Sequence, residues 1–258
     1  MKKKIFFSSV ILLIISSIFF LNSKGARYTG INYSIIKEEI SNFKKITDFY
    51  ERHNNYKKLV KTINNNNKRQ DKQILDISTW VYKNIKKISA SDDIIDSHPW
   101  TIVERKKGAE DQISDILSVL LVYSDIDSFY KAKLNGKKGL FTFFKHNNSW
   151  SVIDPYYGIY FLNNKNQFCN LNEHKYKKCI IYHLEFGKVT NNKLNEIFFN
   201  RNFEDLIQLN DYYNYLLQDL PESEKIDNMN IYYRGGRSYT QKPFHRFIYQ
   251  VQKLINYR

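Results

Sequence analysis

Apolar residues follow three different patterns along this chain, and each pattern predicts a different kind of element. The run from Ile5 to Leu21 is apolar except for serines, and its length suits a helix that crosses a bilayer. Apolar positions at helical spacing predict two amphipathic helices, from about Ser34 to Tyr50 and from Ile74 to Ile88. The run from Ile113 to Val122 is apolar enough to predict the buried central helix of a domain.

Short alternating segments after this central helix predict an antiparallel β-meander, because they are rich in aromatic and β-branched residues. Asn135-Gly136 and Asn147-Asn148 lie between them and are turn signals. The expected strands are Phe129 to Leu134, Leu140 to Phe144, Trp150 to Ile153, Tyr156 to Phe161 and Ile180 to Phe186. Two further helices are expected, from Asn200 to Leu220, where Pro221 ends the pattern, and from Phe244 to Tyr257.

These elements predict an α+β fold and divide the chain into four parts. Residues 1–22 are expected to form a signal anchor or transmembrane helix, and residues 23–69 a helical stalk that begins with a polar linker. Residues 70–190 are expected to form the core domain, in which the buried central helix packs on the meander. Residues 191–258 are expected to form a helical, basic C-terminal extension. A hydrophobic content of 42% is sufficient for one domain with a real core.

The N-terminal pattern also predicts where the protein resides. Lys2, Lys3 and Lys4 precede the apolar run, and positive charge at this end favours a cytoplasmic N-terminus. An uncleaved anchor is favoured over a cleaved signal peptide, because Ala26 has Lys24 two residues before it instead of a small residue. We therefore expect a single-pass protein of the cytoplasmic (inner) membrane, attached through this helix and with its body on the extracytoplasmic side.

The formal net charge of +14 does not predict nucleic-acid binding. Proteins that bind nucleic acids usually gather Lys and Arg into one patch or along one helix. In this chain the lysines are spread among asparagines and isoleucines, and no zinc-finger spacing, basic zipper or RNA-binding motif accompanies them. We expect no nucleic-acid partner.

The cysteines and histidines limit the chemistry of the chain. Cys169 and Cys179 flank a polar, Lys-rich segment, and they form either a disulfide bridge or two unpaired thiols. The histidines show no metal-ligand spacing, so we expect no metal and no cofactor. These histidines are His53, His98, His174, His183 and His245.

Two stretches of the predicted core domain carry polar residues in a recognisable arrangement. Gly108, Glu110, Asp111 and Gln112 open the buried helix, and the segment from Trp150 to Pro155 ends the third predicted strand with an Asp-Pro pair. This order resembles the transglutaminase-like branch of the papain-type cysteine enzymes. The resemblance implies a cysteine at the start of the helix, a histidine on a following strand and an aspartate on the next strand. In such a site the helix N-terminus favours the thiolate, and the His–Asp pair transfers the proton.

The resemblance extends from about Gln70 to Phe161 and implies a degenerate member of the family. The position of the cysteine falls on Glu110, and that of the histidine falls on or beside Gly139. The aspartate corresponds to Asp154 and is retained. Two of the three catalytic groups are therefore absent, so a catalytically inactive protein with a transglutaminase-like core is expected.

We consider two functions from different classes. The first is a binding or accessory factor in cell-envelope or surface-polysaccharide processes, with an envelope protein or a polysaccharide as its ligand. The second is a hydrolase or transferase that uses Glu110 and Asp154 as paired carboxylates, which requires both to face one cavity. Against the second, Glu110 suits the start of a helix electrostatically, and Asp154 before Pro155 can cap a turn.

Candidate binding residues come from the same stretches and from the C-terminal part. Asp111 and Gln112 belong to the helix start, and Trp150 is either a ligand platform or, more commonly, a core aromatic. Trp100, which follows a polar loop, is a candidate to line a cleft. Arg234 and Arg237 either bind an anionic group such as a phosphate or uronate, or belong to a solvated basic loop.

Overall fold

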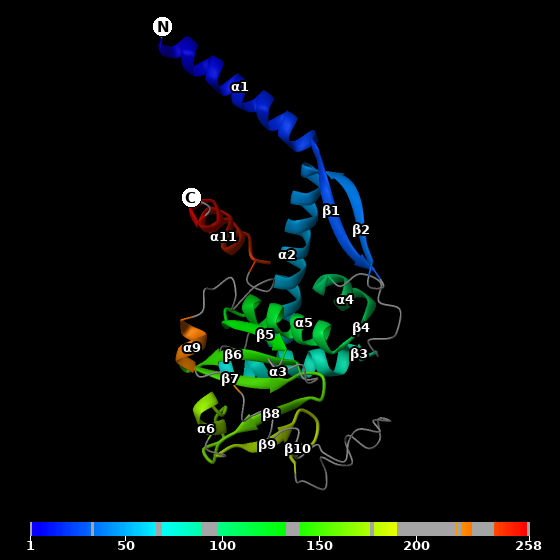
Figure 1. The fold of residues 1–258 in the computed structure, drawn as a ribbon, viewed down its shortest axis with the longest axis vertical. Helices are drawn as coiled ribbons and strands as arrows, with labels where there is room; N and C mark the ends of the chain where they lie inside the picture. The colour runs from blue at the N-terminus through cyan, green and yellow to red at the C-terminus, as the bar shows by residue number, and fades with distance from the viewer. Residues whose placement is uncertain are drawn as a thin grey trace.

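A computed structural model describes residues 2–31, 34–65, 69–88, 98–132, 140–175, 178–189, 220, 223–228 and 240–256. Its fold is α+β, with a six-stranded antiparallel sheet and helices on both faces of that sheet (Figure 1). The α+β prediction is therefore confirmed. Gly139, Arg234, Arg237 and all but the last residue of the helix expected from Asn200 to Leu220 lie outside the described residues.

The sheet is a meander in which each strand pairs with its neighbours in the chain, in the order β10-β9-β8-β7-β6-β5. Between β6 and β7 the chain turns at Asn147 and Asn148, both with positive φ, as the Asn-Asn signal predicted. The strands are β5 (Ser128–Ala132), β6 (Leu140–His146), β7 (Ser149–Asp154), β8 (Ile159–Leu162), β9 (Ile180–His183) and β10 (Gly187–Lys188).

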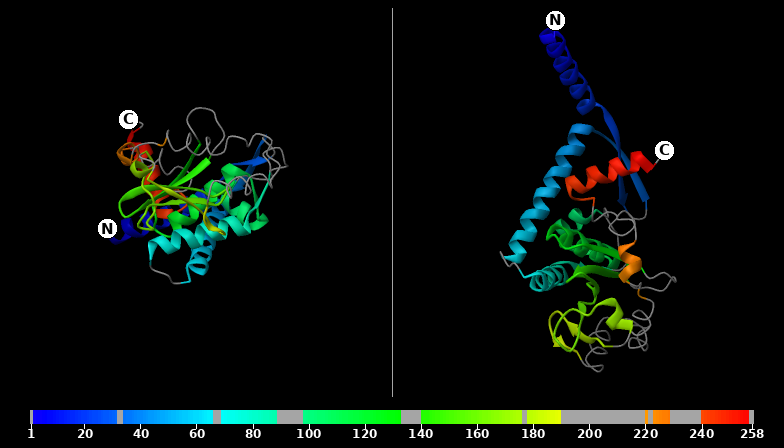
Figure 2. Two further views of the ribbon diagram at one scale, coloured as in Figure 1. Left: turned by 90° about the horizontal axis from the view of Figure 1, so that it is seen from below. Right: turned by 90° about the vertical axis from the view of Figure 1, so that its left-hand side faces the viewer.

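One face of the sheet is covered by the central helix α5 (Glu110–Tyr123), which packs on β5 and β6. Every residue of α5 from Gln112 to Tyr123 is buried, because three more helices surround its other sides. These helices are α2 (Asn42–Asn64), α3 (Gln70–Asn84) and α4 (Pro99–Arg105), and a short parallel pair, β3 (Lys86–Lys87) and β4 (Lys107–Gly108), connects their ends. Figure 2 shows α2 running from the sheet toward the N-terminal part of the chain.

The other face of the sheet carries a second apolar cluster, built around Trp150, Val152 and Phe143. Two five-residue helices contribute to it: α6 (Leu171–Lys175), which lies between the two cysteines, and α9 (Ser223–Asp227). The sheet therefore separates two cores, one beneath α5 and one beneath α6 and α9. The chain ends in α11 (Pro243–Asn256), in agreement with the last predicted helix.

The helix predicted from about Ser34 is wrong over its first part, because residues 34–41 form a strand. β1 (Lys24–Ile31) and β2 (Ser34–Ser41) pair as an antiparallel hairpin, and α2 begins only at Asn42. Ser41 ends the hairpin and caps the helix, since its side chain accepts a hydrogen bond from the Lys44 amide. The predicted stalk is thus partly β, because pairing with β1 outweighs the helical spacing of Ile36 and Ile40.

The predicted membrane anchor is also corrected. The N-terminal run does form a helix, α1 (Lys2–Asn22), which projects away from the rest of the chain (Figure 1). None of the helices in the described ranges has the combined length and apolar character needed to cross a membrane. Two pairs of serines, Ser8-Ser9 and Ser16-Ser17, interrupt the apolar run from Ile5 to Leu21. The predictions of a transmembrane signal anchor and of a single-pass inner-membrane location are therefore wrong.

Candidate functional site

The start of α5, where the sequence suggested a degenerate active site, is a structural junction between helix and sheet. Glu110 is the first residue of the helix, and its Oε1 accepts a hydrogen bond of 3.0 Å from the Leu140 amide at the start of β6. One turn later Ser114 Oγ donates to the Leu140 carbonyl, and Thr142 Oγ1 donates to the Ser114 carbonyl. The Glu110 carboxylate therefore contributes to the attachment of α5 to the first residue of β6.

Gln112 closes the same helix start from within. Its Oε1 accepts from the Ala109 amide at 3.1 Å and from Arg105 Nη2 at 2.8 Å. This is the return half of a capping box, which satisfies an amide that the first turn leaves without a helical partner. Asp111 beside it is exposed. Gln112 thus has a structural use here, and Asp111 faces solvent.

The space around Gly108 explains why the motif begins with a glycine. A Cβ at this position would lie 3.1 Å from Ile102 Cγ2, 3.3 Å from Ile113 Cγ1 and 3.4 Å from Ile85 Cγ2. The three isoleucines are buried, so they leave little room for an added methyl group. The glycine therefore permits the close approach of β4 to the base of α5.

Asp154 ends β7 and is buried, and its Oδ1 accepts a hydrogen bond of 2.9 Å from the Tyr157 amide in the following turn. Side chains alternate between the two faces of a strand. Asp154 therefore shares its face with Val152 and Trp150, which belong to the core away from α5. Glu110, in contrast, contacts the sheet from the α5 side. The geometry thus does not present Glu110 and Asp154 as paired carboxylates on one face.

The two tryptophans proposed as binding residues both pack within the protein. Trp150 is 0% exposed, and its Nε1 donates to Asp227 Oδ1 of α9 at 3.0 Å. Trp100 packs edge-on against Tyr56, and its Nε1 donates to Glu104 Oε1 one turn later on α4. Trp150 is therefore a core aromatic and not a ligand platform. Trp100 is partly buried against the cluster of apolar residues around α5.

A pocket lies elsewhere, between the end of α2 and one face of α3, with a cavity volume of about 590 Å³. This volume is within the range of small-ligand sites. The lining combines an aromatic ring, side-chain amides and charged groups, and no residue suggested by the sequence motif belongs to it. The lining residues are Ile63, Asn64, Asn65, Lys72, Asp76, Thr79, Trp80, Lys83 and Asn84.

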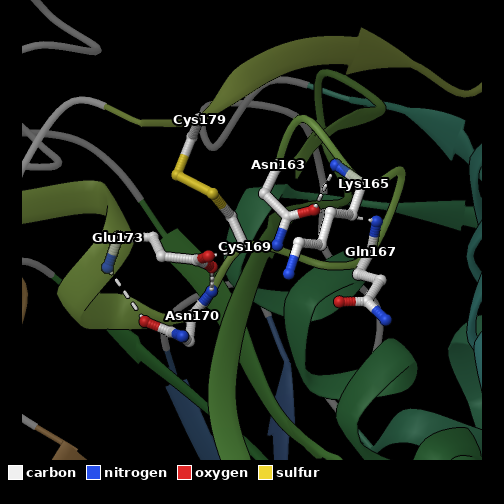
Figure 3. The surroundings of a disulfide bond; sticks show 7 residues. All are labelled: Asn163, Lys165, Gln167, Cys169, Asn170, Glu173 and Cys179. Atoms are coloured by element: carbon white, nitrogen blue, oxygen red, sulfur yellow. Dashed lines mark hydrogen bonds between the residues drawn. A yellow bond between two sulfur atoms is a disulfide. The ribbon is translucent and has the colours of Figure 1, made fainter.

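The two cysteines form a disulfide with a Cα–Cα distance of 5.9 Å (Figure 3). His174 of α6 lies between them in sequence and beside them in space. The two sulfurs and a ring nitrogen of His174 all lie within 4.8 Å of one another. His174 is 4% exposed, and neither ring nitrogen has a hydrogen-bond partner among the described residues. Burial lowers the pKa of this imidazole to about 3, so the ring is neutral at ordinary pH.

The sequence patterns do not predict a role for His174, because the two cysteines alone suggest a disulfide and the histidines alone show no metal-ligand spacing. The signal was available in the regular spacing Cys169-x4-His174-x4-Cys179. Spacings of this kind, two thiols and one imidazole within a short segment, are typical of metal sites.

Comparisons with known proteins give weak similarities. No protein-family model matches the chain, and no curated protein is significantly similar to it. Two solved structures match part of it. One, described as a "putative cysteine protease" from Cytophaga hutchinsonii, is 18% identical with a TM-score of 0.35, over 40% of this chain and 37% of that chain. The other, described as a "putative protease" from Parabacteroides distasonis, is 11% identical with a TM-score of 0.34, over 55% of this chain and 29% of that chain. The chain therefore spans well under half of each solved structure that it matches.

Proposed function

We propose that this protein is a non-catalytic binding protein with a transglutaminase-like core that has lost its cysteine chemistry. The observation that carries the proposal is that both cysteines of the chain are joined in one disulfide. The chain has only two cysteines, and both are in the disulfide beside α6, away from the helix start where the family places its nucleophile. Glu110 occupies that helix start, and a carboxylate is a much weaker nucleophile toward an amide carbonyl than a thiolate.

The loss of thiol chemistry is tested by labelling the native chain with an electrophilic, thiol-directed peptide probe. We expect no labelling of the oxidised, folded protein, and labelling of two cysteines after reduction and unfolding serves as the control. Amide hydrolysis and glutamine-dependent transamidation are measured in parallel, with no activity expected. A native chain that hydrolyses an amide and loses this activity in Glu110→Gln contradicts the proposal, and it would instead support the acid–base alternative.

The pocket between α2 and α3 supports a polar, anionic ligand of saccharide size. Trp80 offers an aromatic surface for a sugar ring. Asn84 Nδ2 donates to the Trp80 carbonyl, so the side-chain oxygen of Asn84 is the group that can accept from a sugar hydroxyl. The pocket lining carries two positive charges, on Lys72 and Lys83, and one negative charge, on Asp76, so the pocket attracts negatively charged ligands. We propose an acidic oligosaccharide, such as a uronate-containing one, as the ligand class. The expected cell-envelope role depended on the membrane anchor and is not part of this proposal.

Binding is tested by titrating the full chain with trigalacturonate and with neutral cellotriose, using tryptophan fluorescence and calorimetry. We expect trigalacturonate to bind more tightly, and Lys72→Ala/Lys83→Ala to weaken it about tenfold, since each exposed charge contributes about 0.5 to 1 kcal/mol. Lys57→Ala/Lys58→Ala, on exposed positions of α2 outside the pocket lining, is the matched control. Equal loss in both double variants would indicate non-specific charge attraction and would contradict a site in this pocket.

A further inference from the structure

We propose that Cys169, His174 and Cys179 form a Zn²⁺ site when their disulfide is reduced, so that the disulfide and the metal are alternative states of one cluster. The inference does not depend on the proposed binding function, because none of the three residues lines the pocket between α2 and α3. It rests on the composition, the spacing and the burial of the cluster.

The geometry suits a tetrahedral ion. All three ligand atoms lie within 4.8 Å of one another. Zn–S bonds of about 2.3 Å and Zn–N bonds of about 2.0 Å place ligand atoms close to 4 Å apart. A Cα–Cα distance of 5.9 Å allows the sulfurs to separate by side-chain rotation after reduction, without a large backbone movement.

His174 is the second observation that points to a ligand. Buried polar groups in folded proteins nearly always have hydrogen-bond partners, and leaving one without a partner costs about 1 to 3 kcal/mol. The His174 ring is 4% exposed and packs edge-on against Phe161, yet neither of its nitrogens has a partner in the described part of the chain. A metal ion between the sulfurs and this ring satisfies one nitrogen.

The backbone around the cluster is held by contacts that do not involve the disulfide. Asn170 and Glu173 cap α6 reciprocally: Asn170 Oδ1 accepts from the Glu173 amide, and Glu173 Oε2 accepts from the Asn170 amide, both at 2.9 Å (Figure 3). The Cys169 amide donates to the Phe161 carbonyl, and the Lys178 amide donates to the Glu173 carbonyl. Reduction therefore leaves the segments that carry the three ligands in place.

The conversion balances with a phosphine as the reductant. The phosphine attacks Sγ of Cys179, which is the more exposed cysteine, and Cys169 leaves as a thiolate. Water then displaces the Cys179 thiolate from phosphorus, the phosphine becomes its oxide, and the two protons of that water go to the two sulfurs. Zn²⁺ binding to both sulfurs releases these two protons. Re-oxidation needs a two-electron oxidant, such as a small-molecule disulfide, which is reduced to two thiols.

Three protein ligands leave one position for water or another small ligand. Glu173 does not supply it in this arrangement, because Oε1 accepts from Asn163 Nδ2 and Oε2 accepts from the Asn170 amide. Among the described residues, no fourth His, Cys, Asp or Glu joins Cys169, His174 and Cys179 in this cluster. Two thiolates and one imidazole with an open fourth position is a ligand set that Zn²⁺ accepts.

The test uses Co²⁺ as a spectroscopic substitute for Zn²⁺ on the full chain, with a phosphine that keeps the thiols reduced. We expect one equivalent of Co²⁺ to produce thiolate-to-cobalt charge transfer and the visible bands of a tetrahedral ion, and Zn²⁺ to abolish them by displacement. The oxidised chain is expected to produce neither. Absence of these bands in the reduced wild type, or equal bands in the oxidised protein, overturns the proposal.

The histidine is tested by His174→Asn, with His146→Asn as the matched control because His146 lies on β6 outside the cluster. We expect His174→Asn to weaken Co²⁺ binding by about tenfold or more, and His146→Asn to leave it unchanged. Zinc X-ray absorption of the reduced wild type provides a measurement that does not depend on the folding of a variant. It should show two sulfurs and one imidazole nitrogen, and a spectrum without imidazole scattering overturns the assignment of His174.

Discussion

The start of α5 and the segment around α6 differ in how their polar groups are used. At the start of α5, Glu110 and Gln112 both accept hydrogen bonds from backbone amides that hold the helix to its surroundings. Beside α6, the buried His174 ring has no hydrogen-bond partner in the described structure. Glu110 and Gln112, in the region that resembles an active site, thus use their side-chain oxygens to hold the fold, whereas α6, between the two cysteines, carries a buried ring whose nitrogens have no hydrogen-bond partner among the described residues.

This difference shows which kind of polar residue indicates a ligand. A polar side chain in a recognisable motif is weak evidence when its hydrogen bonds are satisfied by the backbone, since architecture alone explains it. A buried polar side chain without a partner lowers stability, and it persists more readily if something else compensates for that cost.

The largest expected effect comes from opening the disulfide beside α6. The bridge closes a loop with a sequence separation of 10, for which the loss of chain entropy predicts a stabilisation of about 3 kcal/mol. We expect a phosphine with a metal chelator to lower the free energy of unfolding by that amount, measured by chemical denaturation. Cys169→Ala/Cys179→Ala should not respond to the phosphine. A wild-type protein that is equally stable before and after reduction contradicts a stabilising bridge.

The next effect is the acid sensitivity that His174 confers. In the unfolded chain the imidazole has its ordinary pKa of about 6.5 and binds a proton below that pH, whereas in the folded protein burial lowers the pKa to about 3. The unfolded state therefore binds more protons between these values, and stability falls as pH falls, by about 1.4 kcal/mol per pH unit. Between pH 6 and pH 4.5 the oxidised wild type should lose about 2 kcal/mol more than His174→Leu.

The measurement is chemical denaturation of both proteins at several pH values in that range. At pH 7 the two should be similar, or His174→Leu more stable, because leucine removes the polar group without a hydrogen-bond partner. Parallel pH dependences of the two proteins would show that the His174 ring is not held neutral by burial, and this would remove the contrast with the start of α5.

Much of the fold could be predicted from local sequence pattern. The central helix, the meander and the turn at Asn147 and Asn148 follow from apolar periodicity and turn chemistry, which act over a few residues. The hairpin of β1 and β2 could not be predicted in the same way. Ile36 and Ile40 are spaced as in a helix, and only their pairing with β1 determines that they form a strand.

The candidate sites depend even more on contacts that are distant in sequence. Whether Asp154 faces the α5 side is determined by the register of β7, since a shift of one residue reverses every side chain of a strand. The lack of a partner for His174 is a property of the whole enclosure around α6, which no spacing reveals. The pocket likewise requires the end of α2 to lie against α3, and the helical pattern of each gives no information about their packing.

A smaller effect is expected from Gly108→Ala at the base of α5. The added methyl group meets Ile102, Ile113 and Ile85 at 3.1 to 3.4 Å, and relieving such crowding in a packed core should cost between about 1 and 2 kcal/mol. Gly25→Ala is the matched control, because its methyl group meets mainly the flexible end of Lys45. Chemical denaturation of both variants tests this. Equal stability of the two would mean that Gly108 is not required by packing.

The smallest predicted effect separates the structural role of Glu110 from its charge. Glu110→Ala removes the acceptor of the Leu140 amide and should cost about 1 kcal/mol, whereas Glu110→Gln keeps a carbonyl oxygen there and should cost less than half as much. Hydrogen exchange of the Leu140 amide should accelerate in the alanine variant and change little in the glutamine variant. Asp111→Asn, an exposed neighbour in the same helical turn, controls for the effect of charge near the helix N-terminus. If Gln and Ala are equally destabilising, the charge of Glu110 matters more than its hydrogen bond. The start of α5 would then retain a carboxylate whose purpose its backbone contacts do not explain.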